Sequence, residues 1–536
     1  MKIPLTPLRC LRYAEQQYPH RTAVVCGNER FTYKEFAERA GRLAGALRAA
    51  GVKPGDRVAF LSLNCHRLLE AYYGVVEAGA ILLPLNVRLA PQELAYILND
   101  AGAKILFLEK DFLAMVDSFR ARLPEMRFYL LNDSPRADWL QPQNYEKLLA
   151  HAEPHRADIM QIDEDAVAEL FYTSGTSANP KGVMLTHRNI YLHALQVCLT
   201  FDATKDIAQI HTIPLFHANG WGVAHTLALT GGKHVMVQRF DTERIFRLIE
   251  QERVHFMCLV PAMAMALIHC PERQKYDLSS LERINIGGAA SSPTLVREVE
   301  EAFHVECTSG YGLTETSPVL SVSTMKLGLN WQGEEKYIGQ ARTGFPVPGV
   351  ELRVVDADDK DVPADGKSVG EIVARGDGVM KGYWNQPAAT EEVMRGGWFH
   401  TGDMATIGED GYLLIVDRKK DIIVSGGENI SSLDIEKTMA AHPSVYEVGV
   451  IPVPDAKWGE VPKALVVLKP GATATEQELL DFCRANIAHY KAPRSVEFVE
   501  SLPKTGTGKI LKKDLRKKYW DGQETIRPNY AAKKSS

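Results

Sequence analysis

One stretch of the sequence combines the residue types that can hold a polyphosphate. Residues 172–182 read YTSGTSANPKG and lie between two mostly apolar runs, 167–171 and 183–185. Hydroxyl groups and the backbone N–H groups near glycine can surround phosphate oxygens, and a lysine adds a positive charge. The pattern predicts a strand, a phosphate-binding loop and a second ordered element. The expected phosphate contacts are Thr173, Ser174, Gly175, Thr176 and Lys181.

Two other interpretations of this stretch are weaker. A Walker A loop needs its lysine after the second glycine, whereas Lys181 precedes Gly182. An ordinary polar turn uses the same residue types, because Ser, Thr, Asn, Gly and Pro are the commonest turn residues. Eleven residues in this order favour phosphate binding over a plain turn.

Two further segments carry residues suited to a nucleotide and its charge. Residues 309–316 read SGYGLTET, in which an aromatic ring can stack on a base, a threonine can reach a phosphate and a carboxylate can hold Mg²⁺. Residues 502–512 read LPKTGTGKILK and precede a basic helix. By charge alone, the lysines and arginines of 504–518 would suggest an anionic surface or nucleic-acid patch.

These three segments resemble, in composition and order, the signatures of the adenylate-forming superfamily, which includes acyl-CoA synthetases, luciferases and adenylation domains of peptide synthetases. The resemblance extends over essentially the whole chain. It implies that Tyr311 lies by the adenine of ATP, Thr314 by the α-phosphate and Glu315 at Mg²⁺. It also implies that Lys509 is the lysine that catalyses adenylation, a more specific assignment than a basic patch.

The resemblance assigns binding roles to several glycine-rich and charged segments. The small residues Gly287, Gly288 and Ala289 follow an apolar strand and would line the adenine pocket, although a tight turn explains them equally well. Asp403 could be a turn former, but the resemblance gives it the ribose hydroxyls. In the charge run 416–421, which is otherwise typical of a solvated face, the resemblance points to ribose contact and a hinge. The remaining assignments are Arg418 to the ribose, Lys420 to the hinge, and Gly426 and Gly427 to the pantetheine arm of coenzyme A.

The acyl side of the site is expected at residues 213–222. A histidine near aromatic residues is usually a satisfied core side chain. In acyl-CoA synthetases a similar Phe-His segment borders the acyl pocket and a nearby tryptophan can gate it, so His217 and Trp221 become pocket candidates. One departure concerns Ser431 and Ser432, which stand where fatty-acyl relatives often carry Tyr-Pro.

Length and composition agree with a multidomain enzyme. At 536 residues the chain exceeds the size of a single growing core. The net charge of −5 gives no field that would favour nucleic acid. The eight cysteines form no C-x-x-C pair, which argues against a zinc site or a disulfide framework. Without an apolar leader or a membrane-spanning run, we expect a cytoplasmic location, at most peripheral membrane contact, and by analogy a possible homodimer.

Periodicity predicts the order of the elements. Apolar residues at helical spacing predict helices, and short apolar runs predict strands. The expected helices are 31–50, 68–76, 91–99, 242–252, 433–441 and 476–489, with a helix start at Thr186 or Asn189. The expected strands are 58–63, 81–85, 105–108, 256–260, 284–286, 351–355, 445–452, 463–468 and 495–499.

Alternating strands and helices predict an α/β fold with a largely parallel sheet covered on both faces. The expected architecture is a large multi-layer α/β N-terminal domain with a β-rich subdomain near residues 339–371, plus a small mobile α+β C-terminal domain. The expected boundaries are 1–417 for the first domain, 418–422 for the hinge and 423–536 for the second.

The resemblance therefore implies an ATP-dependent acid:CoA ligase that makes an acyl-AMP and then an acyl-CoA. Residues 216–221 are similar to segments in enzymes for medium-chain or branched fatty acids, and in some for short thioether or aromatic acids. We expect a medium-chain to long-chain fatty acid, with ATP, Mg²⁺ and coenzyme A. A CoA-independent enzyme that loads a carrier protein, and a non-catalytic nucleotide-binding or membrane-tethering protein, are the alternatives.

Overall fold

The computed structural model describes residues 2–132, 137–173, 179–202, 207–425, 428–455, 457–504 and 509–520. The chain divides into two compact units. Unit 1 comprises Met1–Glu351 and Ala374–Phe399, and unit 2 comprises Leu352–Val373 and His400–Ser536.

Two sheets of mainly parallel strands form the framework of unit 1. The seven-stranded sheet runs, in order, β18 (Gly382–Tyr383), β8 (Lys181–Thr186), β7 (Val167–Thr173), β4 (Ile81–Pro84), β3 (Arg57–Leu61), β5 (Ala103–Leu108) and β6 (Arg127–Leu130). The nine-stranded sheet runs β15 (Phe345–Pro346), β14 (Val319–Val322), β13 (Glu306–Gly312), β12 (Arg283–Gly287), β11 (Phe256–Leu259), β9 (Ala208–His211), β10 (Lys233–Met236), β1 (Thr22–Cys26) and β2 (Glu29–Thr32).

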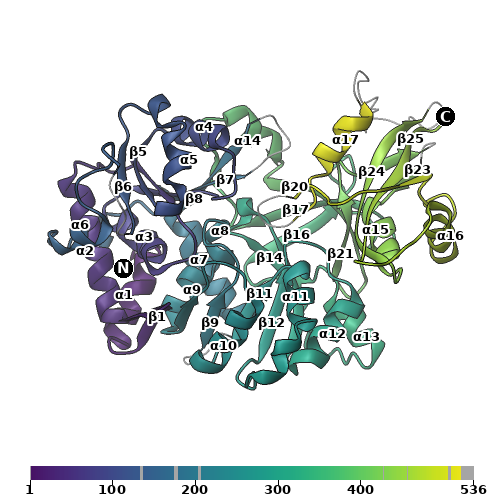
Figure 1. The fold of residues 1–536 in the computed structure, drawn as a ribbon, viewed down its shortest axis with the longest axis horizontal. Coiled ribbons are helices and arrows are strands. Elements are labelled where there is room, and N and C mark those ends of the chain that lie inside the picture. The colour runs from purple at the N-terminus through teal and green to yellow at the C-terminus, as the bar shows by residue number, and fades with distance from the viewer. Residues whose placement is uncertain are drawn as a thin grey trace. The chain divides into compact units, whose positions relative to one another are not determined.

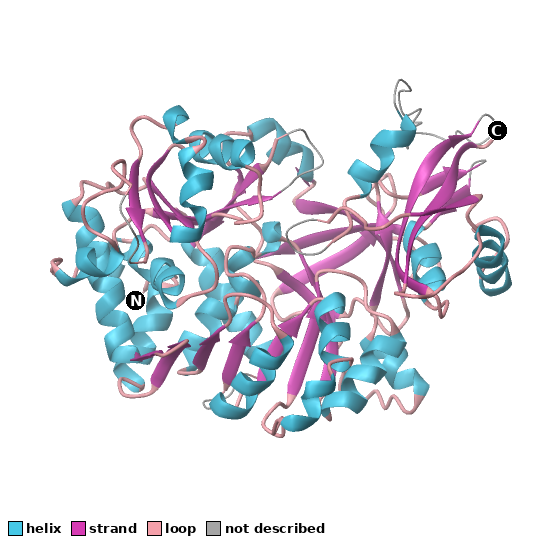
Figure 2. Cartoon of the chain, in the orientation of Figure 1, coloured by secondary structure: helices cyan, strands magenta, loops and turns pink. Residues whose placement is uncertain are grey.

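Helices cover these sheets and connect their parallel strands (Figure 2). The helices of unit 1 are α1 (Leu8–Gln17), α2 (Tyr33–Ala49), α3 (His66–Glu77), α4 (Pro91–Ala101), α5 (Leu113–Asp117), α6 (Tyr145–Ala150), α7 (His187–Thr200), α9 (Val223–Thr230), α10 (Thr242–Glu252), α11 (Pro261–Ile268), α12 (Pro293–Phe303), α13 (Glu334–Gln340) and α14 (Pro387–Val393). The segment labelled α8 (Ala218–Trp221) in Figure 1 has left-handed backbone angles, and we treat it as a turn.

The helix starts show why these segments fold locally. Thr32 caps α2 and forms a reciprocal capping box with Glu35. Thr186 caps α7 in the same way with Asn189, as the sequence predicts. Each box satisfies backbone N–H groups that a helix start leaves without intrahelical partners.

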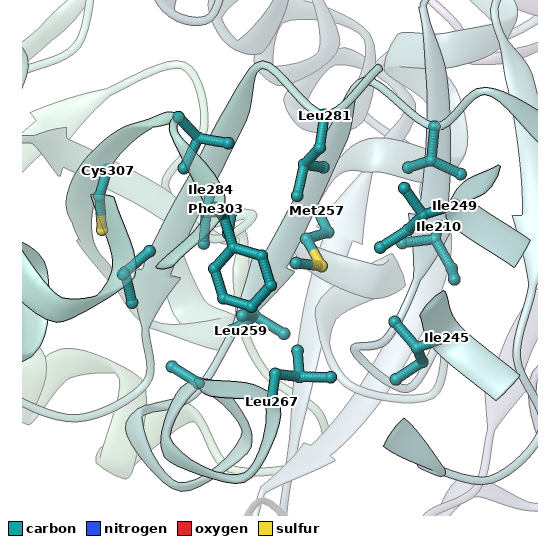
Figure 3. Packing of buried hydrophobic residues seen from close by; sticks show 14 of the residues in the cluster. Ile210, Ile245, Ile249, Met257, Leu259, Leu267, Leu281, Ile284, Phe303 and Cys307 are labelled. Atoms are coloured by element: carbon teal, nitrogen blue, oxygen red, sulfur yellow. The ribbon is translucent and has the colours of Figure 1, made fainter. Parts of the chain in front are cut away.

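The core of the nine-stranded sheet is aliphatic. Ile245 and Ile249 of α10 pack with Ile210 of β9 and Met257 of β11, and Phe303 of α12 closes the cluster (Figure 3). All but Phe303 are fully buried. Burying large apolar side chains of this kind stabilises a fold by about 1.5–3 kcal/mol each. This core holds β11, β12 and β13 in register, and the candidate site lies at the carboxyl ends of those strands.

A third sheet has the order β16 (Val350–Val355), β17 (Gly370–Gly376), β20 (Trp398–Ile407) and β19 (Met394–Arg395), with β21 (Leu413–Arg418) paired to β20. The division between the units falls within β16, β17 and β20. The β-rich part expected at residues 339–371 thus includes strands from later in the chain.

Unit 2 contains a smaller α+β core. Its sheet has the order β23 (Glu428–Ile430), β22 (Ile423–Ser425), β25 (Gly459–Leu468) and β24 (Val445–Asp455), with β26 (Ser495–Phe498) paired to β25. Helices α15 (Ser432–Ala440) and α16 (Glu476–Asn486) pack on it, and α17 (Lys512–Trp520) lies against β24.

The predicted fold class is confirmed: a large mixed α/β N-terminal part is followed by a small α+β C-terminal part. Most predicted elements are present within two or three residues of their expected bounds. The predicted hinge, residues 418–422, lies inside unit 2. Its role, the domain bounds built on it and the mobility of the C-terminal domain stay predictions.

Candidate functional site

The predicted phosphate-loop segment connects two antiparallel strands. Thr173 ends β7 and pairs with Lys181 at the start of β8. Ser174, Gly175 and Thr176 lie outside the described residues. Gly182 follows Lys181 where space is short, because a Cβ there would lie 3.0 Å from Trp384 Cβ and 3.0 Å from Tyr172 Cζ.

Tyr383 contacts both Lys181, which is predicted to bind phosphate, and Glu315, which is predicted to bind Mg²⁺. The Lys181 Nζ lies 4.8 Å from the centre of the Tyr383 ring. The Tyr383 hydroxyl donates a hydrogen bond to Glu315 Oε1 at 3.0 Å. Burial, followed by the neighbouring Glu315 charge, raises the pKa of Tyr383 well above its usual range. The hydroxyl therefore stays protonated and can donate throughout the physiological pH range.

The segment that carries Glu315 is a short 3₁₀ turn, Thr314–Thr316, which packs against β8. Thr314 is buried at the start of this turn. A Cβ on Gly312 would lie 1.7 Å from the Pro318 backbone oxygen, so only glycine fits there. The close approach of the backbone at Gly312 to the backbone at Pro318 fixes the position of the turn that carries Thr314 and Glu315.

The predicted adenine-side residues lie at the ends of two neighbouring parallel strands. Gly287 of β12 pairs with Gly310 of β13, and Tyr311 follows Gly310. Gly288 has a φ of +77°, a conformation that side chains rarely adopt. Ala289 comes next and is exposed. Ligands bind at the carboxyl ends of such strands in open α/β sheets, so the placement suits the predicted pocket.

Trp221 lies over the same glycines. A Cβ on Gly287 would meet Trp221 Cη2 at 3.0 Å, and one on Gly288 would meet Cζ2 at 3.5 Å. The indole also packs on an apolar cluster of Val197, Phe201, Ile213, Phe256, Cys258, Val322 and Val347. His217 is half-buried and precedes the turn that carries Trp221.

In unit 2, two predicted ribose ligands pair with each other. Arg418 Nε lies 2.7 Å from Asp403 Oδ1, and these residues are opposite each other on β20 and β21. Lys420 is half-buried, and burial lowers its pKa. Lys509 is exposed. Gly426 and Gly427 lie outside the described residues.

Most cations of the basic C-terminal helix have carboxylate partners inside unit 2. Lys512 Nζ lies 2.8 Å from Glu436 Oε1, and Lys518 Nζ lies 2.6 Å from Glu497 Oε1. Arg516 pairs with Asp421. Because Lys512 and Arg516 are largely buried with their carboxylate partners, α17 has fewer cations available to an anion than its sequence suggests.

Sequence reasoning did not find several of the residues that organise these positions. Tyr383 lies far along the chain from both of its partners, and no motif marked it. The buried Glu169 had a visible signal, since it is an acidic residue within an apolar strand. In the sequence, Asp417 and Lys512 stand out only as parts of charge runs.

The described residues are consistent with magnesium at Glu315 but do not surround an ion by themselves. Within the described ranges, no three His, Cys, Asp or Glu side chains are grouped as a metal site. Mg²⁺ commonly takes one or two carboxylates together with phosphate oxygens and water, which a single glutamate fits. In the same ranges, none of the helices is both long and apolar enough to cross a membrane.

Comparison with known proteins identifies the family. The model for the AMP-binding enzyme matches residues 11–384, and that for the AMP-binding enzyme C-terminal domain matches residues 434–509. The chain belongs to the AMP-binding enzyme family. It is an adenylate-forming enzyme of the acid–thiol ligase class. ATP and CoA are the usual co-substrates of such ligases.

The relatives of this AMP-binding enzyme are named for several different acid substrates. It is 36% identical to 4-hydroxybutyrate–CoA ligase 2 of Metallosphaera sedula, covering 96% of this chain and 94% of the relative. It is 39% identical to a long-chain-fatty-acid–CoA ligase of Thermus thermophilus, covering 91% and 90%. A feruloyl-CoA synthase from Amycolatopsis is also 39% identical, covering 94% and 96%.

Solved structures agree with this membership. ATP-bound MatB from Rhodopseudomonas palustris has a TM-score of 0.85 and 29% identity, covering 97% of this chain and 100% of that one. The anthranilate CoA ligase AuaEII, in complex with anthranoyl-AMP, has a TM-score of 0.87 and 26% identity, covering 97% and 98%.

Proposed function

We propose that this AMP-binding enzyme activates a medium-chain to long-chain fatty acid with MgATP and transfers the acyl group to coenzyme A. The observation that carries the choice of acid is the surrounding of Trp221. Its indole packs on a hydrophobic cluster of aliphatic and aromatic side chains and the Cys258 thiol. Such an apolar wall suits an alkyl chain.

In the first half-reaction the substrate carboxylate attacks the α-phosphorus of ATP, giving acyl-AMP and pyrophosphate. Phosphoryl transfer depends mostly on positioning and charge neutralisation. Lys181 and the hydroxyls of the 173–176 segment would bind the β- and γ-phosphates. Lys509 would bridge the carboxylate and the α-phosphate.

The remaining nucleotide contacts follow the predicted motifs. Glu315, oriented by Tyr383, would hold Mg²⁺, which supplies charge neutralisation at the phosphates when bound. Tyr311 and the segment 287–289 would contact the adenine. Asp403 and Arg418, already paired with each other at 2.7 Å, would contact the ribose hydroxyls.

In the second half-reaction the CoA thiolate attacks the acyl-AMP carbonyl, and AMP leaves. Lys509 must withdraw before the thiol can approach, so we propose a rotation of the C-terminal domain about Lys420. The segment containing Gly426 and Gly427 would then line the path of the pantetheine arm.

Replacement of Lys509 by Ala separates the two half-reactions. Loss of a group that stabilises the transition state should lower the rate of acyl-AMP formation by about a hundredfold or more. Thioester formation from supplied acyl-AMP should stay close to wild type. Stopped-flow pyrophosphate release and CoA-thioester assays measure the two steps. Equal loss in both would contradict the role of Lys509.

The acid is tested by a panel. Pyrophosphate and AMP release are followed with acetate, butyrate, octanoate, palmitate and benzoate, each with and without CoA. We expect a maximum at octanoate or longer and CoA-dependent AMP release. A maximum at butyrate or benzoate would instead favour an acid of the kind named for the butyrate– and benzoate–CoA ligase relatives from Arabidopsis thaliana. Pyrophosphate release that is indifferent to CoA would favour a carrier-protein-loading enzyme.

A further inference from the structure

The turn that carries Trp221 has an unusual backbone. Five successive residues have positive φ: Ala218 at 44°, Asn219 at 45°, Gly220 at 65°, Trp221 at 64° and Gly222 at 84°. Left-handed helical geometry costs a residue other than glycine roughly 1–2 kcal/mol. A run that includes Ala218 and Trp221 persists only where the surrounding structure holds it in place.

A buried carboxylate holds this turn from the adjacent strand. Glu169 of β7 is fully buried. Asn219 Nδ2 donates to Glu169 Oε2 at 3.0 Å, and His225 Nε2 donates to Glu169 Oε1 at 2.8 Å. The Asn219 Oδ1 in turn accepts a hydrogen bond from the Gly222 N–H at 2.7 Å. Both ends of the turn are therefore tied to one side chain of β7.

The chemistry of the pair fixes the direction of these bonds. A buried carboxylate is stable only when its oxygens accept hydrogen bonds, and each oxygen of Glu169 has one donor. Among the described residues His225 Nδ1 has no hydrogen-bond partner, so the ring proton belongs on Nε2. Loss of either donor would leave one oxygen of the buried Glu169 carboxylate without a hydrogen bond. The side chains of Glu169, Asn219 and His225 therefore hold the turn firmly, and we call these three residues the clamp.

The clamp determines where the Trp221 ring can lie. Trp221 is two residues from Asn219 and one from Gly222, and its ring fills the space over Gly287 and Gly288. On the other side, β7 continues from Glu169 to Thr173 at the start of the phosphate-loop segment. One strand thus positions both the tryptophan and the first phosphate-loop residue.

We infer that Glu169, through Asn219 and His225, is a positioning residue that sets the orientation of Trp221 and with it the acyl-chain preference of the enzyme. This inference rests on the proposed function, since it assigns Trp221 to the acyl pocket. Loosening the hydrogen bonds of Glu169 should change which acids are preferred.

The main test uses Asn219→Gly, which keeps a backbone able to adopt positive φ and removes the side-chain hydrogen bonds. Glu169→Gln is the second variant. It keeps the size of the side chain but replaces one acceptor with a donor that opposes His225 or Asn219. The kcat/KM is measured for butyrate, octanoate, palmitate and benzoate, and the KM for ATP is measured with each acid.

We expect the ratios of kcat/KM between acids to change about fivefold or more, while any change in the KM for ATP should be the same whichever acid is present. The change should vanish in a Trp221→Phe background, because the clamp acts through that ring. Unchanged ratios, or equal changes with and without Trp221, would overturn the inference.

Tyr33→Phe is the matched control. The Tyr33 hydroxyl is equally buried and donates to the backbone oxygens of Leu227 and Gly232, at the far end of α9 from the turn. The Tyr33→Phe substitution removes buried hydrogen bonds to α9, the helix that also carries His225, and to the chain just after its C-terminal end. It should leave the ratios of kcat/KM between acids unchanged.

A measurement without turnover separates this inference from the proposed function. The contribution of Trp221 to fluorescence is the difference between proteins with and without Trp221→Phe. Acrylamide quenching of that contribution should rise about twofold in Asn219→Gly, because the ring is less firmly held. Wild-type enzyme that is inactive with every acid would refute the proposed substrate class alone, whereas unchanged quenching would refute the clamp.

Discussion

The lysine of the phosphate-loop segment and the lysine that begins α17 have opposite surroundings. Lys181 lies against the face of Tyr383 and, within the described residues, has no carboxylate in ion-pair distance. Lys512 Nζ contacts Glu436 Oε1 at 2.8 Å and the Ser432 hydroxyl at 2.6 Å, and that hydroxyl donates to Asp417 Oδ2 at 2.6 Å.

The difference separates charge kept available for a ligand from charge used for structure. Tyr383 lies between Lys181 and Glu315, so it contacts both without neutralising either. In unit 2, burial works against the charged form of Lys512, but Glu436 and Asp417 outweigh it and raise the lysine pKa. Because its charge is already paired with buried carboxylates, Lys512 is a structural residue of unit 2 and is not available to bind a phosphate.

The largest effect should come from breaking the buried network. Lys512→Met leaves Glu436 and Asp417 without their cation, and removing one partner of a buried pair costs about 3–5 kcal/mol. Hydrogen exchange of the α15 and α17 amides should accelerate accordingly. The exposed neighbour gives the control: Lys513→Met should change protection by less than about 0.5 kcal/mol. Similar exchange in both variants would show that Lys512 is not structural.

The next effect concerns the tyrosine between Lys181 and Glu315. Tyr383→Phe removes the donor to a carboxylate and keeps the ring over Lys181. Hydrogen bonds to charged groups contribute about 1.5–3 kcal/mol, so kcat/KM for MgATP should fall at least tenfold. Raising the Mg²⁺ concentration should restore part of the loss, because Glu315 would be less well oriented. Tyr383→Leu should lose more, and an unchanged Tyr383→Phe would remove the tyrosine from the site.

A smaller effect follows from buried histidines of unit 1. Burial lowers the pKa of His193 to about 3 and that of His211 to about 4. Unfolded histidines titrate near pH 6.5, so between these values the unfolded chain binds more protons. The contribution of each buried histidine to the free energy of unfolding should therefore be fully present above about pH 6.5. It should decrease toward pH 4 by about 1 kcal/mol per pH unit for each histidine.

Urea unfolding between pH 8 and pH 5, combined with hydrogen exchange, tests this for each unit separately. Protection in unit 1 should decrease with acidity. Protection around the Lys512 network should not decrease with acidity, because burial raises the pKa values of Glu436 and Asp417 and the folded state therefore binds protons more readily than the unfolded chain. A His193→Gln variant should have a shallower pH dependence. An equal decrease in both units would remove the contrast.

The smallest effect should come from an exposed pair on the same helix as Lys512. Lys518 pairs with Glu497 at 2.6 Å, but its side chain is 67% exposed. Solvent and salt screen such a pair, so Lys518→Ala should cost less than about 1 kcal/mol and leave the protection of α17 nearly unchanged. A cost similar to that of Lys512→Met would contradict the role of burial.

The helices and strands, and the residues that belong to motifs, could be predicted from the sequence alone. The apolar spacing of residues 242–252 predicts α10 with its observed bounds, because that helix buries one aliphatic face. The order of the glycine-rich and charged segments predicts Tyr311, Glu315 and Lys509, and the chain does belong to the family they indicate. Their roles stay predictions.

Other features depend on distant contacts and were not predictable. The left-handed turn contains Ala218 and Trp221, which disfavour its backbone angles, so local preference argues against it. It forms because Asn219 meets Glu169, which lies fifty residues earlier in the chain. Tyr383 similarly meets Lys181 and Glu315 only because β18 pairs with β8. The charges of 417–421 read as solvated until α15 and α17 fold over them.

The left-handed turn limits how this enzyme can be redesigned. The 217–222 segment of this enzyme, grafted into another ligase, would lack the carboxylate of Glu169 and the imidazole of His225 that hold it in place here. Its tryptophan would then be free to settle elsewhere, and the hybrid would lose selectivity without gaining that of the donor. Segment exchanges should therefore move Glu169 and His225 together with the turn, as one inherited module.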